Sequence, residues 1–180
     1  TAEDGTRVPI SLVMSTATAA RIDAGEQVPT LIYGYGSYES SIDPSFSVAR
    51  LSLLDRGMVY AVAHVRGGGE MGRLWYEDGK KLVKKATFTD FVACARHLVD
   101  SGLTAPDRLV AEGGSAGGLL MGAVANLAPE LFAGIQAVVP FVDPLTSILM
   151  PELPLTVIEW DEWGDPLHDA EVYDYMASYA

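Results

Sequence analysis

The sequence lacks the features of disulfide-rich and membrane-spanning proteins. It contains a single cysteine, Cys94, which excludes an internal disulfide framework and a cysteine-rich zinc site. It has no apolar run of the ~18 residues that a membrane span needs, because Gly, Pro or charge interrupts each hydrophobic stretch. Of the 180 residues, 49% are hydrophobic and 20% are charged. This composition is typical of a globular domain with a core.

Positive charge is missing from the second part of the sequence. All 12 Lys and Arg residues lie at or before Arg108, whereas 11 of the 24 acidic residues follow it. The net charge of -12 argues against nucleic-acid binding. The acidic segment is either a solvated face that keeps the protein soluble or a site that attracts cationic substrates. Composition alone favours the solvated face.

The start of the sequence carries no targeting signal. Residue 1 is Thr, and no positively charged region followed by an apolar one comes after it. We therefore expect a cytoplasmic protein whose true N-terminus precedes this chain.

Apolar periodicity predicts alternating strands and helices. Strands are expected at residues 8–16, 28–33, 58–65, 108–112 and 135–139, and helices at 47–56, 88–99 and 117–127. The apolar strands at 58–65 and 135–139 are expected to be buried. This alternation is typical of a parallel sheet with helices on both faces. After Pro140 the pattern is lost, and we expect an irregular excursion across the top of the sheet.

Residues 113–118 read Gly-Gly-Ser-Ala-Gly-Gly, which matches the G-x-S-x-G nucleophile elbow. The motif lies between a predicted strand and a predicted helix, as the elbow requires. The sharp turn presents the serine hydroxyl above the sheet, and side chains at Gly113 and Gly117 would collide with neighbouring backbone. The alternative, a flexible Gly-Ser loop, is less favoured in this context. We therefore predict that Ser115 is a nucleophile.

A serine nucleophile needs a general base. His168 is the one histidine that follows Ser115, and it lies in a polar turn with no strand end before it, so we predict a surface histidine. His64 falls within a predicted buried strand and His97 within a predicted helix, and both precede the serine. We therefore expect the general base to lie outside this chain.

Two other motifs suggest different chemistry. Gly67, Gly69 and Gly72 satisfy the glycine spacing of a dinucleotide-binding loop. That fingerprint needs a helix opening at the third glycine, and the aromatic and charged residues 73–79 do not predict one. Cys94 lies on the apolar face of the predicted helix at 88–99, so we predict a core residue and not a nucleophile.

Three blocks of the sequence together resemble the catalytic domain of the prolyl oligopeptidase family of serine peptidases. They are residues 33–36 (Tyr-Gly-Tyr-Gly), residues 65–70 (Val-Arg-Gly-Gly-Gly-Glu) followed by Trp75, and residues 113–118. Within the family, residues 41–43, 51–57 and 140–143 resemble the oligopeptidase B branch, which cleaves after Arg and Lys. The resemblance runs almost from end to end of the chain.

The resemblance implies an α/β-hydrolase fold in which residues 1–180 form part of a single peptidase catalytic domain. The family has an N-terminal β-propeller before the matching region, and its catalytic Asp and His lie well beyond it. The expected sheet is therefore incomplete at its C-terminal end.

The resemblance also implies residue roles. Ser115 would be the nucleophile, and the Tyr35 hydroxyl and the Ala116 backbone N–H would form the oxyanion hole. A pair of acidic residues that holds the basic substrate side chain falls on Glu159 and Asp161, and a carboxylate pair suits an arginine fork. A further acidic position for the next substrate residue matches Asp43, whereas its usual partner is replaced by Ser45.

We therefore expect a serine endopeptidase that hydrolyses short, cationic peptides through an acyl-enzyme, without a cofactor, a metal, nucleic acid or a membrane. The nearest alternative is another member of the same family, either proline-specific or an acylaminoacyl peptidase, although a proline pocket needs aromatic walls without buried charge. A different class of alternative is a non-catalytic remnant or binding module with the same fold.

Overall fold

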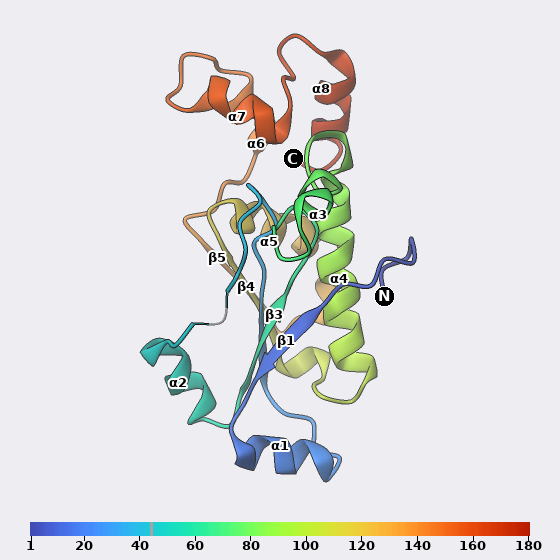
Figure 1. The fold of residues 1–180 in the computed structure, drawn as a ribbon, viewed down its shortest axis with the longest axis vertical. Helices are drawn as coiled ribbons and strands as arrows, with labels where there is room; N and C mark the ends of the chain where they lie inside the picture. Colours follow the sequence, from blue (N-terminus) through green and yellow to red (C-terminus); the bar gives the residue numbers. More distant parts are fainter. Residues whose placement is uncertain (44) are drawn as a thin grey trace.

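A computed structural model of the chain describes residues 1–43 and 45–180. Its centre is a five-stranded sheet in the order β1-β3-β2-β4-β5 (Figure 1). Strand β1 is antiparallel to β3, and all other neighbouring strands are parallel. The strands are β1 (Ile10–Val13), β2 (Thr30–Tyr33), β3 (Val59–Ala63), β4 (Leu109–Gly114) and β5 (Gly134–Val138). The mostly parallel sheet confirms the prediction.

Helices lie on both faces of this sheet. Helices α4 (Lys85–Asp100) and α5 (Ala116–Leu127) pack together on one face, whereas α2 (Val48–Leu54) packs on β3 from the other side (Figure 1). The remaining helices are α1 (Thr16–Asp23), α3 (Arg73–Glu77), α6 (Pro144–Ile148), α7 (Thr156–Trp163) and α8 (Ala170–Ala177). None of the helices in the described ranges is long and apolar enough to cross a bilayer.

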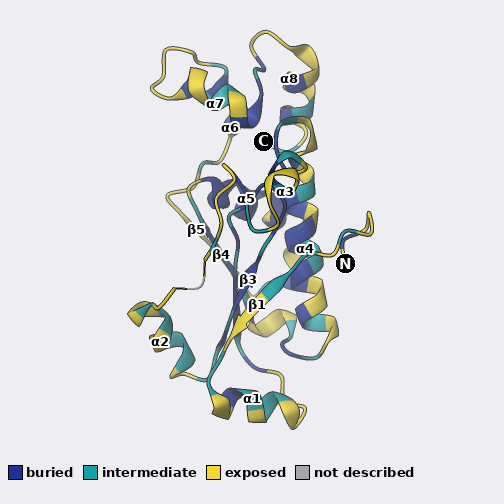
Figure 2. Ribbon diagram, in the orientation of Figure 1, coloured by how far each residue is buried: buried dark blue, intermediate teal, exposed yellow. Residues whose placement is uncertain are grey.

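The core lies between the sheet and the α4–α5 face. The buried strand residues Ile32, Val59 and Leu109 meet the fully buried Phe91 of α4 and Leu120 of α5. Figure 2 shows the buried stripe of α4 turned toward the sheet. Each such side chain contributes about 1.5–3 kcal/mol through burial. Cys94 belongs to this core, and burial raises the pKa of its thiol to about 12. The thiol therefore stays protonated at neutral pH, as expected of a core residue.

The loop after β3 is fixed to α4 by a buried ion pair. The Arg66 guanidinium donates to both carboxylate oxygens of Asp90 at 2.6 and 2.8 Å, and the Arg66 backbone N–H donates to Oδ2 at 3.1 Å. The Thr87 hydroxyl donates to the Arg66 carbonyl at 2.7 Å. Helix α4 begins at Lys85, three residues before the expected start, so Thr87 lies within its first turn.

Several boundaries differ from prediction. The strand expected at 8–16 ends at Val13, because the Ser15 side chain accepts the Thr18 N–H and begins α1. The irregular segment expected after Pro140 contains α6, α7 and α8, which lie beyond the carboxyl ends of the parallel strands (Figure 1). Asp143 and Asp169 cap α6 and α8 with their carboxylates. The caps satisfy backbone N–H groups in the first turn of each helix and so stabilise two helices that are too short to be stable alone.

Strand β5 is less buried than its apolar sequence predicts. Gln136, Ala137 and Val138 are exposed, because β5 is the last strand of the sheet in the described part of the chain. The prediction of a strand was correct, and the prediction of its burial was wrong.

The backbone packs very closely where β4 turns into α5. A Cβ at Gly113 would lie 2.3 Å from the Gly117 carbonyl oxygen. A Cβ at Gly117 would lie 2.7 Å from the Gly34 carbonyl oxygen and 3.3 Å from the Tyr35 Cα. Both distances are too short for a side chain, which confirms the role predicted for these two glycines.

Gly117→Ala should therefore lower the free energy of unfolding by about 1–3 kcal/mol, the usual cost of overpacking. Gly122→Ala on the same helix is the matched control, because its Cβ would meet the nearest atom, Val142 Cγ1, at 3.4 Å. That control should be neutral or stabilising by up to ~1 kcal/mol. Chemical denaturation measures both variants, and a Gly117→Ala protein as stable as wild type would contradict the packing argument.

Candidate active site

Ser115 occupies a strained position at the carboxyl end of β4. Its φ is +54°, a value that non-glycine residues rarely adopt. The turn is held from the neighbouring strand, since the Ser115 N–H donates to the Val138 carbonyl at 2.9 Å and the Phe141 N–H donates to the Ser115 carbonyl at 2.9 Å. The Ser115 residue itself is exposed. The surroundings thus impose a costly conformation that presents the hydroxyl to solvent, which is typical of a functional residue.

Tyr35 and Ala116 lie beside this serine. Tyr35 follows β2, and its Cα and Cδ2 both come within 3.3 Å of where a Gly117 Cβ would be. Burial raises the pKa of Tyr35, and a hydrogen bond with the Ser115 side chain opposes that rise. The phenol is therefore a protonated donor at neutral pH. Ala116 opens α5, so its N–H is one of the first four that have no partner within the helix. The structure brings these three predicted residues together.

A cavity of about 430 Å³ opens beside Ser115. Its walls are mostly apolar and come from the segment after β5 and from the start of α7; they include Phe141, Leu153 and Leu155. Among the described residues that line it, Glu159 is the one charged side chain. The arrangement places a single carboxylate in an apolar cavity next to the Ser115 hydroxyl.

Neutral donors hold the Glu159 carboxylate in place. Glu159 Oε2 accepts from the Tyr38 hydroxyl at 2.7 Å and from the Trp163 indole N–H at 2.9 Å. Burial and this hydrogen bond both raise the pKa of Tyr38, so the phenol remains a donor. Neither partner carries a positive charge. The negative charge of Glu159 is therefore not neutralised by these contacts.

The other two predicted acidic residues lie elsewhere. Asp161 is 82% exposed and pairs with Lys81 Nζ at 3.3 Å, and it does not line the cavity. The reason is helical geometry, because residues two apart on α7 point to different faces. Asp43 is exposed in the loop before α2 and also does not line the cavity. The structure thus does not bring Asp161 or Asp43 together with Glu159.

Sequence reasoning missed Glu162, which is buried on α7. Its Oε1 accepts the Tyr38 backbone N–H at 3.0 Å, and its Oε2 accepts the Tyr76 hydroxyl at 2.7 Å. Glu159 and Glu162 are three residues apart, so they share one face of the helix. A prediction of a helix at residues 156–163 would have placed Glu162 on the same face as Glu159, and the spacing of the two residues is the signal that could have found it.

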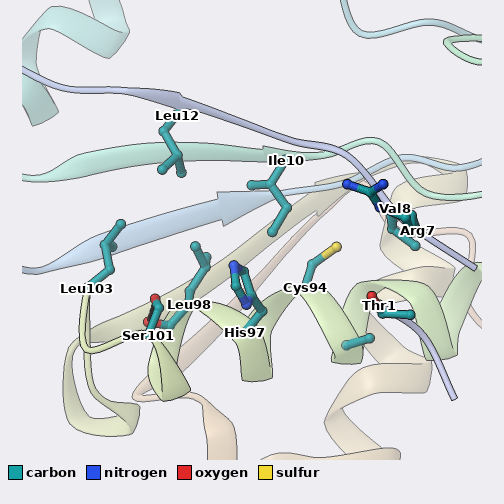
Figure 3. Close-up of a pocket in the computed structure, with 11 residues that line it drawn as sticks. Thr1, Arg7, Val8, Ile10, Leu12, Cys94, His97, Leu98, Ser101 and Leu103 are labelled. Atoms are coloured by element: carbon teal, nitrogen blue, oxygen red, sulfur yellow. Dashed lines mark hydrogen bonds between the residues drawn. The ribbon is translucent and has the colours of Figure 1, made fainter. Parts of the chain in front are cut away.

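None of the three histidines lines the cavity at Ser115. His168 is exposed and its Nδ1 contacts Asp165 Oδ2 at 2.8 Å, as expected of a surface histidine. His64 follows β3 and does not lie within it, and its ring contacts Ser11 and Glu70. His97 lines a separate cavity of about 370 Å³ between β1 and α4, together with Cys94 (Figure 3).

The glycine-rich loop after β3 packs against protein backbone. A short helix, α3, does open after Gly72, contrary to expectation, but it has only five residues. A Cβ at Gly67 would lie 2.0 Å from the Gly36 carbonyl oxygen, and one at Gly69 would lie 2.4 Å from the Glu39 carbonyl oxygen. These glycines permit the close approach of the loop at residues 36–39. The dinucleotide alternative therefore gains no support from the structure.

Comparison with known proteins identifies a family. The model of the prolyl oligopeptidase family matches residues 44–180. Protease 2 from Moraxella lacunata is 53% identical over 180 residues, which are 100% of this chain and 25% of that protein. Dipeptidyl aminopeptidase BI from Pseudoxanthomonas mexicana is 52% identical, over 99% of this chain and 24% of that protein.

A solved structure agrees with the sequence matches. Oligopeptidase B from Leishmania major superposes with a TM-score of 0.94 at 51% identity, over 99% of this chain and 24% of that chain. The chain thus spans about a quarter of the length of its relatives. Because the family model matches most of the sequence and the folds superpose so closely, the chain belongs to the prolyl oligopeptidase family and has its α/β-hydrolase fold.

Proposed function

We propose that the full-length protein is a serine peptidase that hydrolyses short peptides after Arg or Lys through an acyl-enzyme on Ser115. One observation carries the proposal: Ser115 and the un-neutralised Glu159 carboxylate line the same apolar cavity. A cationic side chain in that cavity would meet a fixed, partly desolvated negative charge. The name oligopeptidase B, borne by a solved relative, and the family membership support the peptidase assignment.

The geometry favours acyl transfer. The Ser115 Oγ would attack the scissile carbonyl carbon while a base takes its proton. The negative charge then develops on the carbonyl oxygen, where the Tyr35 hydroxyl and the Ala116 N–H would donate to it. As the tetrahedral intermediate collapses, the base gives its proton to the departing amine, and an ester remains on Ser115. Water then releases the acid by the reverse sequence of steps.

The general base is proposed to lie in a part of the protein outside residues 1–180. None of the described residues that line the cavity is a histidine. The relatives are about four times as long as this chain, which leaves room for the missing triad members. On this proposal, the chain is part of a larger catalytic domain.

Glu159 also separates the proposal from its alternatives. A proline side chain carries no positive charge, so a proline-binding pocket gains nothing from a carboxylate in its wall. The name of dipeptidyl aminopeptidase BI describes an enzyme that removes dipeptides, so an exopeptidase mode is the second candidate. A non-catalytic remnant is disfavoured by the strained φ of Ser115, which costs stability without serving the fold.

Tyr35→Phe in the full-length protein should lower kcat by about 10²-fold or more with little change in KM. The substitution removes one donor that acts mainly in the transition state and keeps the ring. Tyr33→Phe in β2 is the matched control, because the hydrogen bond with the Ser115 side chain that Tyr35 makes is not among the interactions of Tyr33. Steady-state kinetics with an arginyl substrate measures both, and an unchanged kcat in Tyr35→Phe would leave Tyr35 as a packing residue.

Glu159→Gln should lower kcat/KM for an arginyl substrate by about 10–10²-fold, since a hydrogen bond to a charged group contributes about 1.5–3 kcal/mol. A matched substrate with a neutral residue should lose far less. Asp161→Asn is the control on the same helix. Its exposed ion pair with Lys81 contributes about 0–1 kcal/mol, and it lies outside the cavity. Equal losses for both substrates, or a larger loss in Asp161→Asn, would remove the support for basic specificity.

A further inference from the structure

Two buried charged side chains lie against the segment at residues 36–38, and the proposed reaction uses neither of them. Lys84 is 1% exposed and Glu162 is 3% exposed. Lys84 directly precedes α4, whereas Glu162 lies on α7, far away in the sequence. Burying ionised groups is costly unless several partners compensate them. Their contacts therefore indicate what the two residues do.

Lys84 binds the segment from the α4 side. Its Nζ donates to the Gly36 carbonyl oxygen at 2.6 Å and to the Ser37 hydroxyl at 2.7 Å. The same Nζ lies 5.0 Å from the centre of the Trp163 ring. Trp163 in turn donates to Glu159, so the lysine contacts both the Tyr35 segment and the wall of the cavity.

Glu162 binds the segment from the α7 side. It accepts the Tyr38 backbone N–H through Oε1, and the Tyr76 hydroxyl fixes Oε2 at 2.7 Å. The Lys80 Nζ contacts the same Tyr76 hydroxyl at 3.3 Å. Burial lowers the pKa of Lys84 to about 7, and the charge of Glu162 opposes this shift. The Glu162 carboxylate thus favours the protonated form of Lys84.

The backbone conformation of this segment depends on contacts with the rest of the protein. Gly36, Tyr38 and Glu39 have φ values of +71°, +60° and +55°. Two of the three are not glycine, so the conformation is strained and persists only where its surroundings impose it. Tyr35 immediately precedes this stretch, and Tyr38 lies within it. A shift of the segment would move both hydroxyls away from Ser115 and Glu159.

We propose that Lys84 and Glu162 are positioning residues that clamp residues 36–38 from both sides and so aim the Tyr35 hydroxyl at the oxyanion and the Tyr38 hydroxyl at Glu159. The inference rests on the proposed peptidase function for its catalytic consequence. The clamp itself is a property of the fold. A displacement of about 1 Å at a catalytic group can cost 10²-fold in rate, so the clamp is expected to act on kcat.

The kinetic test uses Lys84→Met in the full-length protein, with the exposed neighbour Lys85→Met as the control. Lys84→Met should lower kcat for an arginyl substrate by about 10–10²-fold with KM changed by less than about threefold. In a Tyr35→Phe background, Lys84→Met should lower kcat by less than about threefold further, because the hydroxyl that it positions is gone. Full multiplicative loss in the double variant would overturn the positioning role.

The second test does not depend on activity. Hydrogen exchange of the amides of residues 36–39 should accelerate at least about tenfold in Lys84→Met and not in Lys85→Met. Glu162→Gln keeps the shape of the side chain and should accelerate hydrogen exchange of the same amides. It replaces Lys84→Met as the test variant if the Lys84→Met protein does not fold. Unchanged exchange in the folded variants would overturn the clamp. If the wild-type protein cleaves no arginyl substrate, the proposed function is refuted. Accelerated exchange in the variants would still support the clamp in that case.

Discussion

The site depends on one close contact between backbones. Gly117, at the start of α5, packs on the Gly34 carbonyl and the Tyr35 Cα with no room for a side chain. This contact brings the end of β2 to the turn that carries Ser115. It therefore joins the proposed nucleophile to the residue predicted to stabilise the oxyanion. Gly113 permits the same turn from the strand side, since its Cα faces the Gly117 carbonyl.

Charge distribution gives this site its proposed specificity. The acidic second part of the sequence is not simply a solvated face, because three acidic residues of α7 have different surroundings. Glu159 lines the cavity, Asp161 forms an exposed pair with Lys81, and Glu162 is buried against the Tyr38 segment. The exposed Asp161 fits the interpretation as a solvated face, and Glu159 in the cavity fits the proposed site for a cationic substrate.

Much of the fold was predictable because the apolar pattern of strands and helices is strong between residues 28 and 139. The Ser115 turn was predictable because its glycines are required by packing. Helix α1 was missed, since the Ser15 cap lies within a run rich in β-branched residues. Helices α6 to α8 are short and depend on caps and tertiary contacts, which apolar periodicity does not reveal.

The acidic pair shows why the rest of the site could not be predicted. Glu159 and Asp161 are close in sequence, yet only the helical geometry of α7 decides that they face different ways. The burial of Lys84 and Glu162 depends on how α4 and α7 meet the segment at residues 36–38. Long-range packing of this kind leaves no signal in the local sequence.

The central claim is that Ser115, the Tyr35 segment and Glu159 form one site, and a crystal structure of the full-length protein with a peptidyl argininal tests it most directly. The aldehyde forms a hemiacetal with the Ser115 Oγ, and its oxygen stands in for the oxyanion. We expect that oxygen within about 2.7–3.1 Å of the Tyr35 hydroxyl and the Ala116 N–H, with the guanidinium on Glu159. A hemiacetal oxygen turned away from Tyr35, or an arginine side chain bound away from Glu159, would contradict the account.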